Sequence, residues 1–158
     1  HYFKGKKDIL EEIVANIIDD ITEGFEAVVS SAQLTAVEKL TLMLRGDEKQ
    51  GRAHDQVMQL IKMPENRELQ ERVNIACIEV LAPILLEVLE QGYKEKIFTE
   101  KVSLETVQLI LAASQFMLDS GYFSWDEIKR KKLLRSLQDM LERAAGALPG
   151  TFDFIANV

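Results

Sequence analysis

The chain has 158 residues, 47% hydrophobic and 28% charged, a composition that fits one globular domain and excludes a disordered or low-complexity protein. Its formal net charge of −7 is the wrong sign for a free-standing nucleic-acid binder, because phosphate binding needs clustered lysine and arginine. The single cysteine excludes an intrachain disulfide and a paired-cysteine metal site, and the longest uncharged run, residues 106–118, is too short to span a bilayer.

The chain opens on an aromatic and basic stretch, residues 1–7 (HYFKGKK), that leads directly into an amphipathic helix. We predict this helix from about Lys7 to Ser30, because its apolar residues recur every three or four positions. The expected buried stripe consists of Ile9, Leu10, Ile13, Val14, Ile17, Ile18, Ile21, Phe25, Val28 and Val29.

Two shorter helices are predicted next. Thr35 and Glu38 form a capping box, which satisfies free amides at a helix start, and Gly46 ends that helix. After a polar segment, a third helix is expected from about Arg52 to Lys62, where Pro64 stops it.

A long central helix is predicted from Glu65 to about Glu95. Pro83 lies in its middle, where it removes the hydrogen bond to the Glu79 carbonyl and clashes with the preceding turn. This predicts a kink, or a break into two helices. Apolar residues cover more than one face, as expected for a helix packed on several sides.

The next predicted helix, capped by Ser103, runs from Leu104 to about Asp119 and carries no charge between Glu105 and Asp119. A helix that is apolar all round must be covered on two sides. The domain's own core can cover one side, and a partner subunit the other.

The last predicted helix has a capping box, Ser124 with Glu127, and a hydrophobic staple, Phe123 with Ile128, and it ends at Gly146. No segment shows strand-like alternation between hairpin turns, so the predicted fold is all-α with about six helices. Three apolar side chains of the following tail could fold back on the surface: Phe152, Phe154 and Ile155.

The opening residues Tyr2-Phe3, Lys6 and Ile9-Leu10, followed at once by a periodic helix, resemble the junction where the helix-turn-helix of TetR-family regulators meets the ligand-binding core. The helix pattern of nearly the whole chain is similar to that family. The resemblance implies a multi-helix TetR-like C-terminal domain whose last two helices form a four-helix bundle between two subunits.

The same resemblance implies a domain organisation and a function. Residues 1–6 would be a remnant of the helix-turn-helix domain, 7–146 the effector-binding and dimerisation domain, and 147–158 a C-terminal tail. A small apolar molecule in an internal cavity would alter DNA binding by the absent N-terminal head. Tyr2 and Lys6 would lie near the DNA backbone, although packing of the junction by Tyr2 and a solvated Lys6 are equally open.

Candidate residues for the effector cavity come from the middle helices. For each apolar candidate, plain core packing is a commoner role than ligand binding. For the histidine, a surface position is the commoner outcome. For the cysteine, it is a buried and unreactive thiol. The candidates are Phe25, Val29, Met43, His54, Met58, Ile61, Cys77, Ile78, Leu81, Ile110 and Phe116, with Asn74 and Gln115 as polar handles.

The homodimer interface is expected on the last two helices. The sequence does not determine which side of each helix faces outward. The candidates are Val107, Leu111, Ser114 and Leu118 from the first, and Leu134, Leu137 and Leu141 from the second. The basic run 129–132 sweeps around most of its helix, so it is better explained as a solvated or interface-rim face than as a nucleic-acid site.

Known catalytic patterns are missing from the sequence. With only His1 and His54 available, we find no zinc motif, no helical di-iron motif and no phosphate-binding glycine loop, so no enzyme, metal or cofactor is expected. A cytoplasmic protein without membrane contact is the natural expectation. The alternative function is a helical scaffold or adaptor that binds a protein partner in an exposed apolar groove.

Overall fold

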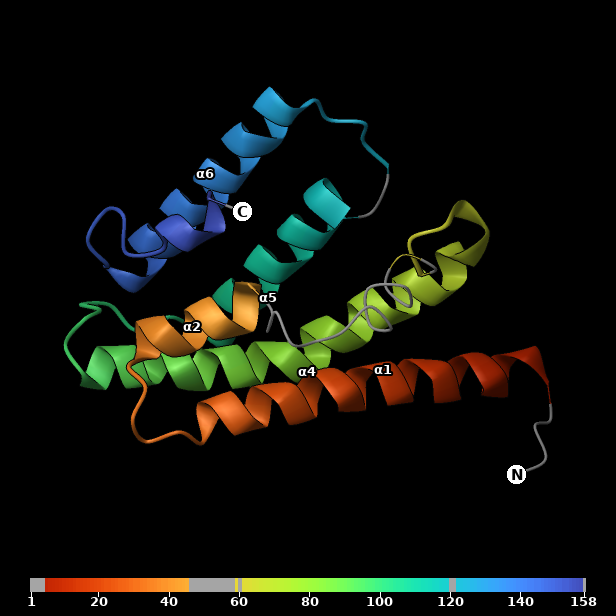
Figure 1. Ribbon diagram of the computed structural model, residues 1–158, viewed down its shortest axis with the longest axis horizontal. Helices are drawn as coiled ribbons and strands as arrows, with labels where there is room; N and C mark the ends of the chain where they lie inside the picture. Colours follow the sequence, from red (N-terminus) through yellow and green to blue (C-terminus); the bar gives the residue numbers. More distant parts are fainter. Residues whose placement is uncertain (1–4, 46–58, 60, 120–121, 158) are drawn as a thin grey trace.

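The computed structural model describes residues 5–45, 59, 61–119 and 122–157, and across these ranges the chain is helical without any strand, which confirms the all-α prediction. The α-helices, labelled as in Figure 1, are α1 (Lys6–Val29), α2 (Ala36–Arg45), α4 (Arg67–Lys94), α5 (Leu104–Ser114) and α6 (Glu127–Ala145). Shorter elements are the 3₁₀ turns η1 (Pro64–Asn66) and η3 (Asp153–Ile155) and a π-helical turn, η2 (Gln115–Asp119). The helix predicted from Arg52 to Lys62 falls mostly outside the described residues.

The helices pack in layers around α4. Figure 1 shows α1 and α4 side by side and running in the same direction, with α2 and α5 on the opposite side of α4. Helix α6 packs against α5 and against the C-terminal turn η3, which also contacts α2. The C-terminal segment therefore belongs to the packed body of the protein.

Two apolar clusters hold these layers together. The larger joins α2, α4, α5, α6 and the C-terminal segment, with Val88, Phe98 and Phe152 almost fully buried at its centre. The smaller lies between α1 and the first half of α4 and contains Ile17, Ile18, Ile61, Val73, Cys77 and Leu81. Burial on this scale is the main source of stability in a helical domain of this size.

The predicted buried stripe of α1 is correct in its middle and wrong at its start. Ile17 and Ile18 are buried, whereas Ile9 and Ile13 are exposed. The smaller cluster contains side chains of α1 only from Val14 onward, so Ile9 and Ile13 lie outside it.

The capping box at the start of α2 is confirmed. The Thr35 amide donates to Glu38 Oε2 at 2.8 Å, and the Glu38 amide donates to Thr35 Oγ1 at 3.3 Å. Hydrogen bonds from the amide and the hydroxyl of Thr35 lower the pKa of Glu38.

A buried lysine connects α1, α2 and α4. Lys39 is 4% exposed, and its Nζ donates to the Val29 carbonyl at 2.6 Å and to Gln91 Oε1 at 2.8 Å. Glu95 Oε2 accepts the Ala36 amide at 3.0 Å, so the end of α4 caps the start of α2. A cation at the C-terminus of α1 is favourable because free carbonyl groups concentrate negative charge there.

Helix α4 continues through Pro83, so of the two predicted alternatives, a kink or a break, the break into two helices does not occur. Figure 1 shows this helix bending along its length. Pro83 and Glu79 both lie on exposed positions, where water can bond the Glu79 carbonyl that the proline leaves without an amide partner.

The start of α6 differs from the sequence prediction. Asp126 is the cap, its side chain accepting the Lys129 amide at 2.7 Å, so Ser124 and Glu127 do not form the predicted capping box. Trp125 Nε1 donates to the Met117 carbonyl at 2.7 Å, and its ring stacks on that of Phe123. These contacts hold residues 123–126 outside the helix.

The predicted hydrophobic staple is also wrong, because Ile128 is 70% exposed and Phe123 packs on Trp125 instead. The predicted end of α6 is confirmed: Gly146 adopts the left-handed conformation with φ of 62°, which glycine accepts without strain.

The C-terminal segment folds back, but its apolar side chains enter the core and do not lie on the surface as predicted. Phe152 has no exposed surface, and Phe154 and Ile155 are buried beside it. Glu142, itself buried, holds this segment in place because its Oε1 accepts the amides of Gly150 at 2.9 Å and Phe152 at 3.0 Å.

Candidate functional site

Two neighbouring apolar hollows lie between α2, α4, α5, α6 and the C-terminal segment. The inner cavity has a volume of about 80 Å³ and is lined by Leu40, Leu44, Leu85, Leu89, Val107, Ile110, Leu111, Ser114, Leu137, Leu141 and Ile155. The outer cleft has a volume of about 240 Å³ and is lined by Leu44, Ser114, Leu118, Arg130, Leu134, Leu137, Phe154 and Ile155.

The two hollows share four wall residues, Leu44, Ser114, Leu137 and Ile155, so they lie on either side of the same side chains. Ser114 Oγ donates to the Leu111 carbonyl of its own helix at 2.8 Å, which leaves its hydroxyl satisfied without a partner from the hollow. Apart from this group, every inner-cavity side chain is aliphatic.

One cationic side chain lies in the wall of the outer cleft. Arg130 Nη1 donates to the Leu118 carbonyl at 3.2 Å, which links the first turn of α6 to the end of η2. Both residues line the cleft, and the remaining wall consists of apolar side chains and Ser114. The arrangement combines an apolar interior with a positive charge at one side.

The residues predicted for the subunit interface all line these hollows. Five of them line the inner cavity, and four line the outer cleft, with two residues common to both. Val107 and Leu141 are buried in the protomer's own core. The others are half-buried along the walls of the hollows: Leu111, Ser114, Leu118, Leu134 and Leu137.

The residues predicted for the effector cavity are dispersed. Ile110 is the member of this set that lines the inner cavity. Met43 is buried in the larger cluster, against which Phe25 and Val29 pack, whereas Ile61, Cys77 and Leu81 belong to the smaller cluster. Asn74 and Ile78 are half-buried on α4, and Phe116 is exposed.

Gln115, predicted as a polar handle, has a side-chain oxygen, Oε1, that is buried without a hydrogen-bond partner. It stands at the start of η2 and lines neither hollow. His54, Met58 and Tyr2 lie outside the described residues, and Lys6 is the first residue of α1.

Sequence reasoning missed the contributions of α2 and of the C-terminal segment to the hollows. Leu40 and Leu44 lie four residues apart on one face of α2, and Leu85 and Leu89 do the same on α4, a spacing that is visible in the sequence. Arg130 stands four and seven residues before Leu134 and Leu137, so the helical spacing that places it on their face is also visible in the sequence.

Cys77 behaves as a packed thiol. It is buried in the smaller cluster, and desolvation raises the pKa of its thiol to about 11. A thiol with this pKa remains protonated at neutral pH, which disfavours a redox or nucleophilic role.

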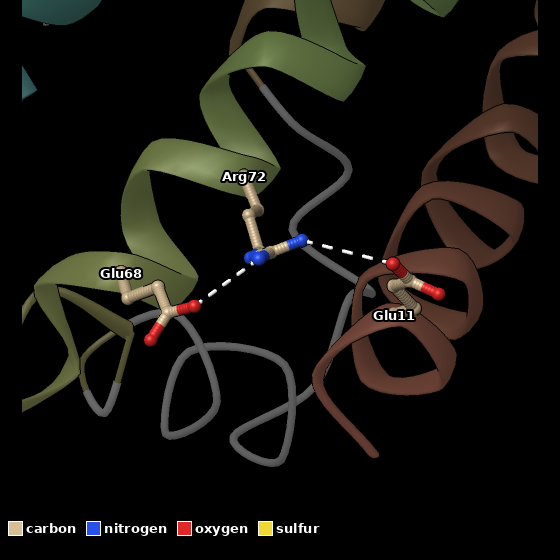
Figure 2. A network of polar contacts seen from close by, with 3 residues as sticks. All are labelled: Glu11, Glu68 and Arg72. Atoms are coloured by element: carbon tan, nitrogen blue, oxygen red, sulfur yellow. Dashed lines mark hydrogen bonds and ion pairs between the residues drawn. The ribbon is translucent and has the colours of Figure 1, made fainter. Parts of the chain in front are cut away.

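A third hollow, the α1–α4 groove, lies on the surface between the first halves of these helices. Its volume is about 440 Å³, and it is lined by Glu11, Val14, Ala15, Ile18, Asp19, Arg72, Ile75, Ala76, Glu79 and Val80. Figure 2 shows Arg72 reaching from α4 toward both Glu68 of the same helix and Glu11 of α1, at 3.1 and 3.9 Å. Ion pairs this exposed contribute little stability, so they orient the two helices more than they hold them together.

The described part of the chain contains neither a cluster of metal ligands nor a membrane-spanning helix. No group of three or more histidine, cysteine, aspartate or glutamate side chains there could hold a metal ion. Likewise, none of the helices formed by the described residues is long and apolar enough to cross a bilayer.

The chain matches a known protein family over part of its length. Residues 50–138, more than half of the chain, match the family described as tetracyclin repressor-like, C-terminal domain. The matched range includes all of α4 and α5, most of α6 and the wall residues that these helices contribute, except Leu141. A search of curated proteins found no match to the chain.

Proposed function

The chain belongs to the tetracyclin repressor-like (TetR) family of transcriptional regulators, and we propose that it is the effector-sensing and dimerisation core of one such regulator. In this proposal a small apolar effector occupies the inner cavity and extends into the outer cleft. DNA is read by residues outside this sequence, and Tyr2 and Lys6 lie close to the DNA backbone in the complete regulator. No reaction is assigned to the chain.

The observation that carries the proposal is the convergence of five separate segments on one apolar space. Helices α2, α4, α5 and α6 and the C-terminal segment each contribute wall residues. Ligand sites between helices of this kind are mostly apolar with few polar groups, as these hollows are. A molecule that fits there touches every layer of the larger cluster except α1.

The size of the space limits the effector. Small-molecule sites usually have volumes of roughly 300 to 1,000 Å³. The outer cleft, about 240 Å³, lies just below this range, and the inner cavity, about 80 Å³, is too small for a ring system. We therefore expect a slender effector, with some opening of the shared wall when it binds.

Lys39 offers a route from this space to α1. Leu40 and Leu44 line the inner cavity from α2, and the neighbouring Lys39 holds the Val29 carbonyl at the end of α1. Suppose that the effector binds one arrangement of α2 more tightly than another. It would then shift the equilibrium between the corresponding positions of α1 by the difference in binding free energy. This is the coupling that a ligand-controlled regulator requires.

The experiment that tests the proposed site is thermal melting with octan-1-ol as a neutral apolar probe. Probe at 100 times its dissociation constant should raise the free energy of unfolding by about 2.7 kcal/mol. Ser114→Phe fills the shared wall of both hollows and should abolish the shift. The matched control, Ala15→Phe, fills the α1–α4 groove and should leave the shift intact.

If the octan-1-ol melting shift is lost in Ala15→Phe and retained in Ser114→Phe, the probe binds in the α1–α4 groove and not in the two hollows. That groove favours the second candidate function, an adaptor that binds a protein partner. Its apolar residue Ile75 is 57% exposed, and it is flanked by the charged side chains Glu11, Arg72 and Glu79. Exposed apolar residues with a charged rim are typical of protein-binding surfaces.

For dimerisation we propose the opposite side of α5 from the one predicted. Leu109 on α5 and Phe116 in η2 are exposed by 71% and 52%, and neither side chain lines the hollows. Met140 is exposed on α6, with Leu133 half-buried two turns before it. These four side chains could pair with their copies across a two-fold axis.

The dimer proposal predicts that Leu109→Asp yields monomers in sedimentation-velocity experiments. Leu148→Asp is the matched control, because Leu148 is equally exposed but lies beyond the end of α6. An unchanged dimer in Leu109→Asp, or a monomeric wild type, would contradict the assignment.

A further inference from the structure

The guanidinium of Arg130 is held at the wall of the outer cleft. Its Nη1 donates to the Leu118 carbonyl at 3.2 Å, and Leu118 is itself a wall residue. An arginine has five N–H donors in a rigid planar arrangement. Since the contact with Leu118 occupies one of them, most of its donors are available to another acceptor.

The positive charge of Arg130 has no carboxylate partner among the side chains that the structure describes, a set that does not include the side chain of Asp119. The two acidic side chains closest in sequence are already engaged. Asp126 accepts the Lys129 amide at 2.7 Å, and Glu127 forms an ion pair with Lys131 at 2.7 Å. Arg130 therefore presents an uncompensated charge beside an otherwise apolar cleft.

The neighbouring basic residues do not share this position. Lys129 lies over the Trp125 ring, Lys131 pairs with Glu127, and Lys132 lines neither the inner cavity nor the outer cleft. Four consecutive helical residues point in different directions around the axis, so only one of them can face the cleft. The site thus has one cation at its wall and a narrow aliphatic end at the inner cavity.

We propose that the effector is an amphiphilic carboxylate, with a slender aliphatic body in the two hollows and its carboxylate paired with Arg130. The proposal rests on the proposed function, which makes these hollows the effector site. Arginine suits this role because its planar N–H groups match the two oxygens of a carboxylate. The aliphatic body explains the walls, and the head group explains the unpaired cation.

The expected preference for an anionic head group is moderate. Arg130 is exposed to solvent, so salt screens its attraction to an anion. We expect octanoate to bind about tenfold more tightly than octan-1-ol at low salt, which corresponds to roughly 1.4 kcal/mol. The preference should shrink as the salt concentration rises, whereas the affinity for octan-1-ol should not fall.

The test is isothermal titration calorimetry with three eight-carbon probes: octanoate, octan-1-ol and octyltrimethylammonium. Wild-type protein should bind octanoate best and octyltrimethylammonium worst. Arg130→Gln should bring octanoate to the affinity of octan-1-ol and leave octan-1-ol unchanged. The control Lys132→Gln removes an equal charge from the same helix turn and should retain the preference; circular dichroism checks that both variants fold.

Each outcome has a distinct meaning. Equal binding of octanoate and octan-1-ol to the wild type would overturn the carboxylate inference and leave the proposed site standing. A preference that survives in Arg130→Gln, or disappears equally in Lys132→Gln, would overturn the role of Arg130. Failure of all three probes to bind would overturn both the inference and the proposed function.

Discussion

Lys39 Nζ lies 2.6 Å from the carbonyl oxygen of Val29, and this contact joins the end of α1 to the helix that lines the inner cavity. Replacing Lys39 with methionine keeps the length of the side chain but leaves the Val29 carbonyl and Gln91 Oε1 without their donor. The free energy of unfolding should fall by about 2 kcal/mol. Urea denaturation measures this loss.

Lys132→Met is the control for the removal of one positive charge, because Lys132 is exposed. It should change the free energy of unfolding by less than about 0.5 kcal/mol. Equal effects of the two substitutions would show that the buried contact of Lys39 does not stabilise the fold.

The Glu142 carboxylate should be required for docking of the C-terminal segment. Its Oε1 accepts hydrogen bonds from Gln138 Nε2 and from the amides of Gly150 and Phe152. Glu142→Ala leaves buried amides without an acceptor and should destabilise the protein by about 3 kcal/mol. Amide hydrogen exchange should show faster exchange at Phe152.

Glu142→Gln keeps the size of the side chain and an oxygen that can accept hydrogen bonds, whereas Glu142→Ala removes both. The amide oxygen of glutamine can still accept from Gly150 and Phe152, so this variant should lose less stability than Glu142→Ala. If the two variants are equally stable, the three hydrogen bonds do not hold the C-terminal segment.

Gly92 should not tolerate a side chain. A Cβ there would overlap the ring of Phe98, which has almost no exposed surface and contacts the ring of Phe152. We expect Gly92→Ala to lower the free energy of unfolding by about 2 kcal/mol, despite the higher helix propensity of alanine. Gly5→Ala, where a Cβ meets nothing within 4 Å, should be nearly neutral; similar losses at both positions would contradict the packing around Phe98.

Much of the fold is predictable from the sequence because its signals are local. The capping box of Thr35 and Glu38 and the left-handed Gly146 depend on a few neighbouring residues, and both are confirmed. At the start of α6 the sequence prediction places the cap at Ser124, whereas the structure has it at Asp126. Trp125 Nε1, which lies between them, donates to the Met117 carbonyl of the preceding helical turn, a contact that no local pattern indicates.

The site was harder to predict, because α5 is apolar on every side. Val107 and Leu111 differ little from Leu109 in hydrophobicity, so no sequence pattern indicates which of them faces the interior. The answer depends on where α2 and the C-terminal segment pack. Arg130 shares a helix face with Leu134 and Leu137 by its spacing, but the sequence does not show that this face borders a cleft.

Cys77 should react slowly with thiol reagents in the folded protein. Burial raises the pKa of its thiol to about 11, and only the thiolate form reacts. The labelling rate should therefore keep rising between pH 8 and pH 10, whereas labelling in urea should level off near pH 9. Rapid labelling of folded protein at pH 7, followed by mass spectrometry, would contradict a buried, protonated thiol.

The most direct test of the proposed effector site is an NMR titration of ¹³C-methyl-labelled isoleucine with octan-1-ol. Ile110 and Ile155 line the inner cavity, while Ile18 and Ile75 line the α1–α4 groove, so the same residue type reports on both locations. We predict saturable shifts of the Ile110 and Ile155 methyl signals, with those of Ile18 and Ile75 unchanged. Shifts confined to Ile18 and Ile75, or no shift at any of the four, would contradict the account.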